Sequence, residues 1–260
     1  MLSVRSEASR AEGWIRTAVA DRDGRSLPRL VAAGGANVTA AATDRWRRPG
    51  WWCPCCDRVT GSFLWVGNQL RLSRHAVCPG CGARSRHRGI ALVLPGLLDP
   101  PPRRILHFAP EAPITAVIGR LAPRVEVVTT DLVRDDVDRP GEDIQALGFG
   151  DGEFDLVLCN HVLEHVPDDA AAVAELARVT APGGLALITV PGDWSRQAPV
   201  TFSDVSFNGH HRDSGTEVID LLGSAFAEVD VLVLGDLADD HRPGRPGLRP
   251  DDRIFLCRPT

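Results

Sequence analysis

The sequence predicts an α/β protein with a mostly parallel sheet, preceded by a small cysteine-bearing domain. Two C-x-x-C motifs between residues 53 and 81 mark the small domain. The apolar run from Phe154 to Leu158 is typical of a strand buried on both faces of a parallel sheet. It stops abruptly at Asn160 and His161, and ligands of open α/β sheets bind in the crevice beyond the strand ends. We therefore expect a central strand here, with the chemistry beside its carboxyl end.

The composition is that of a globular chain with an acidic balance. The 260 residues are 43% hydrophobic and carry a net charge of −5, so nothing global attracts a polyanion and nucleic acid is not expected as a partner. The longest apolar run, residues 90–98, is interrupted by Pro95 and Gly96 and is far shorter than the ~20 residues of a membrane span. The N-terminus lacks the apolar core of a signal peptide. We expect a cytoplasmic protein without a membrane partner, and the sequence does not predict an oligomeric state.

The cysteine motifs predict a structural zinc site. Cys53 and Cys56 are followed, after 21 residues, by Cys78 and Cys81, and two such pairs can place four sulfurs around one ion. The odd total of seven cysteines excludes complete disulfide pairing. Redox-active pairs or untethered cysteines are the alternatives. Cys55 could substitute in register, but the shared C-P-x-C pattern favours Cys53 and Cys56.

The loop after the apolar strand contains a motif with a second interpretation. Residues 161–165 read H-V-L-E-H, which matches a zinc-protease motif that needs both histidines on one face of a continuous helix. Pro167 comes two residues after His165 and steers Val166 away from helical angles. Two full helical turns do not fit, which argues against a zinc protease.

The stretch from Phe154 to Gly184 resembles the class I S-adenosylmethionine-dependent methyltransferases, specifically the type 11 branch. That family has an FDLV strand, a loop like NHVLEHV, the residues PDD, a helix and a PGG turn, and this chain has the same elements at 154–166, 167–169, 170–179 and 182–184. The resemblance covers roughly residues 86–260. It implies a Rossmann-like sheet of seven strands closed by an antiparallel hairpin, S-adenosylmethionine as cofactor, and methyl transfer as the reaction. The expected domains are a flexible tail (1–48), a zinc ribbon (49–85) and a methyltransferase domain (86–260).

The first cofactor loop is expected after the strand that begins at Arg104. In the family this strand ends in an acid and a glycine-rich turn, but here His107 stands at the acid, and Ala109 and Glu111 stand at glycine positions. The series L-H-F-A-P-E resembles this loop in a ribbon-bearing subgroup of the family. The resemblance implies that Glu111 pairs with the cofactor's ammonium group and that Ala109 borders its methionine part.

The same resemblance implies the other cofactor-binding residues. Asp131 follows the strand 125–130 and would accept hydrogen bonds from the ribose hydroxyls. Asp143 and Ile144 would lie beside adenine, and Asn160 would complete the cofactor site.

Two histidines are candidate bases for the methyl acceptor. His161 follows the central strand, and His210 lies in a segment where His210, Arg212 and Gly215 match the subgroup's D-H-V-R-x-Y-G pattern. A neutral imidazole can accept a proton near pH 7. The predicted acceptor site lies between residues 160–165, 210–212 and 86–88.

The expected acceptor is a small molecule or a glycan. The basic series R-S-R-H-R at 84–88 is either a solvated helix start or, as the resemblance implies, a site for an anionic substrate group or the cofactor carboxylate. The alternatives are a zinc-finger RNA methyltransferase and a non-catalytic protein that binds S-adenosylmethionine or uses the ribbon for interaction.

Overall fold

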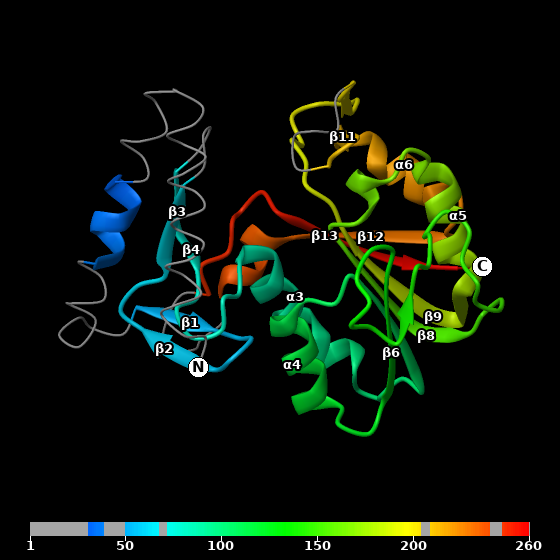
Figure 1. Ribbon diagram of the computed structural model, residues 1–260, viewed down its shortest axis with the longest axis horizontal. Helices are drawn as coiled ribbons and strands as arrows, with labels where there is room; N and C mark the ends of the chain where they lie inside the picture. The colour runs from blue at the N-terminus through cyan, green and yellow to red at the C-terminus, as the bar shows by residue number, and fades with distance from the viewer. Residues whose placement is uncertain (1–30, 39–49, 68–71, 204–208, 240–245, 260) are drawn as a thin grey trace. The chain divides into compact units, whose positions relative to one another are not determined.

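The chain forms two compact units in a computed structural model (Figure 1) that describes residues 31–38, 50–67, 72–203, 209–239 and 246–259. Unit 1 comprises Met1–Leu92 and Ala238–Arg249, and unit 2 comprises Val93–Leu237 and Pro250–Thr260. The predicted methyltransferase domain began at residue 86 and contained 238–249. In the structure, that second stretch groups with the cysteine-bearing unit.

Unit 2 is built on a seven-stranded sheet with the order β12-β13-β9-β8-β5-β6-β7. The strands from β5 to β9 pair in parallel, and β13 runs antiparallel to both β9 and β12. The seven-stranded, mostly parallel sheet with an antiparallel closing hairpin is therefore confirmed. The strands are β5 (Arg104–Phe108), β6 (Glu126–Asp131), β7 (Arg139–Pro140), β8 (Phe154–Asn160), β9 (Thr180–Thr189), β12 (Glu228–Val233) and β13 (Arg253–Arg258).

Strand β8 is central, as its apolar sequence predicts. All of its residues except Asp155 are buried, because it lies between β5 and β9 and is covered on both faces. Helix α5 (Asp169–Val179) follows it and begins where the Asp168 side chain accepts a hydrogen bond of 2.9 Å from the Ala171 amide. The buried residues of α5 recur at helical spacing and join the core cluster under the sheet: Ala172, Val173, Leu176 and Val179. The remaining helices of unit 2 include α4 (Ala112–Leu121) and α6 (Glu217–Gly223).

The glycine pair before the body of β9 has a steric reason. Gly183 has φ +75°, a left-handed conformation that favours glycine. A Cβ on Gly184 would lie 2.8 Å from the carbonyl oxygens of both Asp155 and Ala181. The P-G-G sequence therefore lets the chain turn closely against the start of β8.

The strand order creates a switch point between β5 and β8. From β5 the chain adds β6 and then β7 on one side, and later adds β8 and β9 on the other. In doubly wound sheets this reversal opens a crevice outside the carboxyl ends of the two central strands, where ligands bind. The turns after Phe108 and Asn160 therefore border this crevice.

The described residues of unit 1 form two small antiparallel sheets. One pairs β1 (Trp51–Cys53) with β2 (Arg58–Thr60), and the other pairs β3 (Leu64–Gly67) with β4 (Leu72–Val77). Helix α3 (Ser85–Leu97) then carries the chain into unit 2.

Within the predicted tail (1–48), residues 31–38 form a helix. The Asn37 amide accepts a hydrogen bond of 2.7 Å from the Trp65 backbone N–H and donates one of 2.8 Å to its carbonyl, so it pairs with β3 like an added strand residue. The other residues of this tail lie outside the described part of the chain. No helix in the described part of the chain combines the length and apolarity needed to cross a bilayer.

Candidate functional site

A chain of side-chain hydrogen bonds crosses the switch point. The Asn160 amide, at the end of β8, donates to the carboxylate of Glu111, which lies in the turn after β5, and accepts from the hydroxyl of Thr189 at the end of β9. Asn160 and Thr189 are buried. Two predicted cofactor-binding residues, Glu111 and Asn160, are thus brought into contact across the crevice.

The turns that frame this crevice use left-handed backbone without glycine. Ala109 has φ +44° and donates its backbone N–H to Thr130 across 2.8 Å. His161 has φ +55° and donates its backbone N–H to Thr189 across 2.9 Å. Non-glycine residues at positive φ are uncommon, and such strain gathers at functional sites. The glycine-poor first loop therefore still turns sharply after β5.

Asp131, the last residue of β6, organises the next loop of the crevice. Its Oδ1 accepts hydrogen bonds of 2.8 Å and 3.0 Å from the backbone N–H groups of Val133 and Arg134. Arg134 in turn donates to the carbonyl of Pro110, across 2.9 Å. The loops after β5 and β6 are thereby joined. Among the described residues, no donor reaches Oδ2 of Asp131, so this oxygen remains available to a ligand hydroxyl.

Asp143 and Ile144 are adjacent in sequence, but their side chains lie in different environments. Ile144 is buried in the core cluster. The Asp143 carboxylate accepts from the backbone and side-chain amides of Gln145, and these bonds hold the pKa of Asp143 below its usual range. Gln145 also accepts from the backbone N–H of Asp168, which ties this loop to the start of α5.

His107 is buried inside β5, between Thr129 of β6 and Leu158 of β8. Neither ring nitrogen has a hydrogen-bond partner among the described residues. Burial lowers the pKa of His107 to about 4, and the nearby Glu111 opposes this shift only in part. The imidazole is therefore neutral at physiological pH, and it lies beneath the turn that carries Ala109.

The loop after β8 folds as the proline at 167 predicts. A single 3-10 turn, η1 (Leu163–His165), is followed by Val166 in extended conformation, so the H-x-x-E-H residues do not lie on one continuous helix. Arg212, in strand β11 (Arg212–Asp213), donates to the carbonyls of Leu163, Val166 and Pro167 and lies 3.1 Å from Asp169. This arginine fixes the loop rather than facing an acceptor.

Histidines gather around one buried carboxylate at this loop. Glu164 has a side chain that is 1% exposed, and its Oε1 lies 3.0 Å from Nδ1 of His161. The rings of His165 and His210 meet edge to face with centroids 4.8 Å apart. Burial is the main cause that lowers the pKa of His210. The two predicted bases, His161 and His210, thus both lie close to Glu164, a residue to which sequence reasoning gave no role.

In unit 1, the four predicted cysteines converge. The sulfur of Cys53 lies 3.7 Å from that of Cys81, and the same distance separates Cys56 from Cys78. All four sulfurs lie within 4.8 Å of one another. Four sulfurs placed tetrahedrally at about 2.3 Å from a zinc ion are about 3.8 Å apart, so the cluster fits that ion. Cys55 instead turns to the backbone carbonyl of His87, 3.4 Å away.

The hypothesis of an anion site in the basic series at 84–88 is wrong for Arg88. Its guanidinium is fully buried and donates to four backbone carbonyls, those of Ala76, Ala83, Pro246 and Gly247. It also lies over the ring of Phe63, 4.5 Å from the centroid. The donors of Arg88 are used inside unit 1, so this side chain cannot hold a substrate anion.

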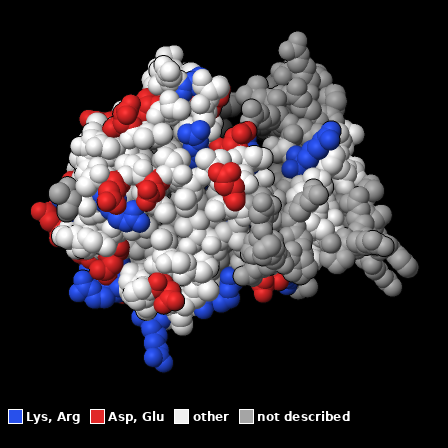
Figure 2. All heavy atoms as spheres, turned by 180° about the vertical axis from the view of Figure 1, so that it is seen from behind, with Lys and Arg blue, Asp and Glu red and all other residues white. Residues whose placement is uncertain are grey.

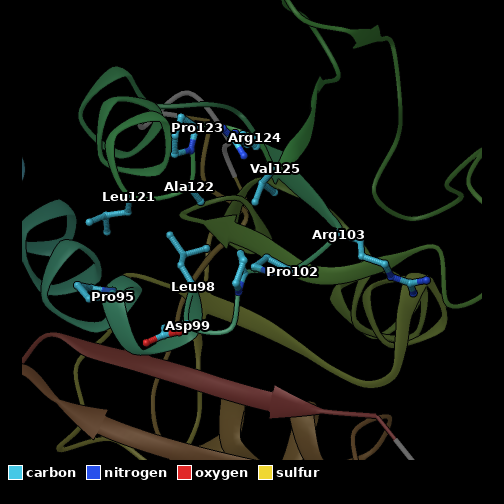
Figure 3. A pocket seen from close by; sticks show the side chains of 11 residues that line it. Pro95, Leu98, Asp99, Pro102, Arg103, Leu121, Ala122, Pro123, Arg124 and Val125 are labelled. Atoms are coloured by element: carbon cyan, nitrogen blue, oxygen red, sulfur yellow. The ribbon is translucent and has the colours of Figure 1, made fainter.

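A pocket in unit 2 lies away from the crevice. Its volume is about 560 Å³, and it is lined by residues that precede β5 and β6, among them Leu98, Arg103 and Val125 (Figure 3). This is the amino-terminal edge of the sheet, opposite Asn160. On the face drawn in Figure 2, acidic and basic side chains of the described residues are interspersed.

Comparison with known proteins identifies one segment. Residues 122–188 match the family model of a methyltransferase domain. The match runs from before β6 into β9 and includes Asp131, Asn160 and Glu164.

Curated relatives match over short stretches. A 2-methyl-6-phytyl-1,4-hydroquinone methyltransferase of Synechocystis sp. is 43% identical over 65 residues, 24% of this chain and 20% of the relative. A ubiquinone biosynthesis O-methyltransferase of Thiobacillus denitrificans is 61% identical over 33 residues, 13% of this chain and 14% of the relative. The chain thus spans a fifth or less of the length of these relatives.

Solved structures resemble the chain at low identity. The 1,6-didemethyltoxoflavin-N1-methyltransferase of Burkholderia thailandensis, solved with 1,6-didemethyltoxoflavin and S-adenosylhomocysteine, has a TM-score of 0.46 at 19% identity and covers 65% of this chain and 76% of its own. The PH0226 protein of Pyrococcus horikoshii has a TM-score of 0.49 at 17% identity, and the match covers 70% of this chain and 94% of that protein's chain.

Proposed function

We propose that this protein is an S-adenosylmethionine-dependent methyltransferase acting on a small-molecule or glycan acceptor. The observation that carries the proposal is the agreement of two independent facts. The segment matching a methyltransferase domain is the segment that supplies β6, β8 and their loops, and these loops border the switch-point crevice. The relatives, one named a hydroquinone methyltransferase and the other a ubiquinone biosynthesis O-methyltransferase, favour a small-molecule acceptor. The acidic balance disfavours RNA.

In this proposal the crevice residues bind the cofactor at separate points. Asp131 offers Oδ2 to the ribose hydroxyls while Oδ1 maintains its own loop. Glu111, oriented by Asn160, pairs with the cofactor's ammonium group. Asp143 and Ile144 face the adenine, and Ala109 lets the backbone turn under the methionine part. His107 stays neutral beneath this turn, so it adds no positive charge that would oppose the ammonium group.

S-adenosylmethionine supplies a methyl group already activated by its sulfonium sulfur. The protein's remaining tasks are alignment and removal of the acceptor's proton. His161 and His210 are the proposed bases, because both lie at the loop after β8 and a neutral imidazole accepts a proton at physiological pH.

The second part of the proposal is a structural zinc ion held by Cys53, Cys56, Cys78 and Cys81. The spacing of the four sulfurs supports it, because the distances match the edge of a zinc–thiolate tetrahedron. No catalytic step is assigned to this ion.

Calorimetry with S-adenosylmethionine tests the cofactor site. Asp131→Ala should weaken binding by about 1 to 3 kcal/mol, the usual cost of removing a charged hydrogen-bond acceptor. Asp131→Asn retains an oxygen for the turn to Val133 and Arg134, so a similar loss in this variant would assign the effect to the carboxylate rather than to the loop.

The matched control is Asp135→Ala, which removes an exposed carboxylate from the same loop and should leave affinity unchanged. Equal affinity of the wild type and both Asp131 variants would contradict the assignment. Cofactor binding without methyl transfer to any small-molecule or glycan acceptor would instead favour a non-catalytic binding protein.

A further inference from the structure

Glu164, His165 and His210 form a cluster that the cofactor site does not use. Each offers one ligand atom, and these three atoms lie within 4.8 Å of one another. Two of the residues come from the turn η1, and the third comes from the segment that leads into β11. Residues 46 positions apart in the chain are therefore brought together with the donor types of a metal site.

The carboxylate of Glu164 is buried, and His161 is the one basic side chain of the described residues that pairs with it. The Glu164 side chain is 1% exposed, and neither oxygen accepts a hydrogen bond of acceptable geometry from the described residues, although Nδ1 of His161 lies 3.0 Å away. Burying an ionised carboxylate is costly unless a cation or several donors face it. The adjacent Arg212 is already committed to three carbonyls and Asp169. Apart from the imidazole of His161, no basic side chain among the described residues pairs with Glu164.

His165 is arranged as a metal-bound histidine usually is. Nδ1 of His165 lies 3.1 Å from the carbonyl oxygen of Gly209, so a neutral ring that donates there presents the lone pair of Nε2 on its other side. A backbone carbonyl that holds one ring nitrogen is the common second contact of metal-bound histidine.

We propose that Glu164, His165 and His210 bind a divalent transition-metal ion, with Zn²⁺ as the first candidate. Two imidazoles and one carboxylate are the donors of many zinc and non-haem iron sites, and three protein ligands leave a position open for an oxygen. His161 then lies beside the ion's carboxylate ligand rather than on the ion.

The metal site predicts the chemical class of the methyl acceptor. This step of the inference rests on the proposed function. An oxygen of the acceptor that occupies the open position would have the pKa of its hydroxyl lowered, and the hydroxyl proton would pass to His161. The acceptor is therefore a hydroxyl compound. In this arrangement His210 is a ligand, and His161 alone remains as the base.

Cobalt binding tests the site directly. Protein is first dialysed against a weak chelator, so that zinc stays in the cysteine cluster and leaves the site at Glu164. Co²⁺ added to this protein should bind at one equivalent and give visible ligand-field absorption. The intense near-ultraviolet thiolate bands that cobalt would show in the cysteine cluster should be absent. A His165→Ala, His210→Ala double variant should bind Co²⁺ at least 10-fold more weakly. His165 is exposed and His210 is partly so, so these changes leave the core intact.

The matched control is His211→Ala, the neighbouring histidine whose side chain lies outside the cluster. Its backbone N–H, which donates to the Glu164 carbonyl, is retained, and its cobalt affinity should equal that of the wild type. Failure to bind a cobalt equivalent, or equal affinity in the double variant, would overturn the site. S-adenosylmethionine binding measured in the same samples separates the two proposals: cofactor binding without cobalt binding refutes only this inference, and the reverse refutes only the proposed function.

Discussion

His107 illustrates how one buried side chain makes stability depend on pH. The folded protein holds this imidazole neutral, with a pKa of about 4 in place of 6.5, because burial disfavours the charged form. Between these pH values the unfolded chain binds a proton that the folded chain does not. The free energy of unfolding should therefore fall as the pH is lowered from about 6.5 to 4, by up to about 3 kcal/mol from this group.

A His107→Leu variant should lose this contribution. Urea unfolding at several pH values would then show a shallower decline for the variant than for the wild type over this range, and no difference in slope above pH 7. Parallel curves over the whole range would mean that the imidazole is protonated in the folded state.

At the scale of single residues, a sequence pattern predicts which side chains meet only where those side chains are of the same chemical type. The spacing of Cys53, Cys56, Cys78 and Cys81 correctly predicts that four like side chains meet. The burial of Arg88 is not predictable in this way, because its partners are backbone carbonyls and two of them lie more than 150 residues away. The gathering of His210 at Glu164 likewise depends on a loop whose path no local pattern encodes.

At the scale of elements, the hydrogen bonds of Arg212 should keep the loop after β8 in one conformation. Its guanidinium holds three carbonyls of residues 163–167 and lies beside Asp169 at the start of α5. Arg212→Met keeps the length of the side chain but removes these donors. We expect faster hydrogen exchange of the amides of residues 163–169, because the loop loses its contacts with β11.

The comparison variant is Arg258→Met, which removes a surface arginine that pairs with Glu228 and Asp230 on the edge hairpin. It should leave exchange in residues 163–169 unchanged, since exposed ion pairs contribute little. Unaltered exchange in Arg212→Met would show that the loop is held by its buried apolar residues instead.

Elements with a strong pattern were predictable, and short ones were not. The apolar run of β8 and the proline at 167 correctly predict a buried strand and a broken helix. Strand β7 has only two residues, Arg139 and Pro140, both exposed, so no periodicity marks it. The helix over 31–38 was missed because its Ala- and Gly-rich sequence lacks an apolar stripe, and Asn37 anchors it by a side-chain contact to Trp65.

At the scale of the whole molecule, metal content should report on unit 1. The purified protein should hold one zinc ion per chain in the cysteine cluster, and a Cys78→Ser, Cys81→Ser variant should lose it, because thiolate donors are required. Cys55→Ser is the control: it retains a donor for the His87 carbonyl and should keep the ion. Elemental analysis after dialysis against a weak chelator decides the matter. Full zinc content in the double variant, or loss in the control, would reassign the ligands.

The arrangement of the sheet was predictable as a whole although parts of the chain were not. The family resemblance carried the strand order, and the order in turn explains why Glu111 and Asn160 meet. Domain limits were harder, because the segment 238–249 has the Pro, Gly and Arg composition of an ordinary surface loop. Nothing in that composition indicates that Pro246 and Gly247 pack within unit 1.

The chain's return to unit 1 between β12 and β13 limits how this protein can be taken apart. Deleting residues 1–92 would remove Arg88 and Phe63 but leave Pro246 and Gly247. The carbonyls of Pro246 and Gly247 would then lose the Arg88 donor. The segment 238–249, which connects the two strands of the closing hairpin, would lose the unit with which it groups. The two units are therefore not interchangeable cassettes. A shortened or chimeric protein would have to exchange residues 238–249 together with the N-terminal part. The connector of the closing hairpin and the cysteine cluster therefore have to be transferred together.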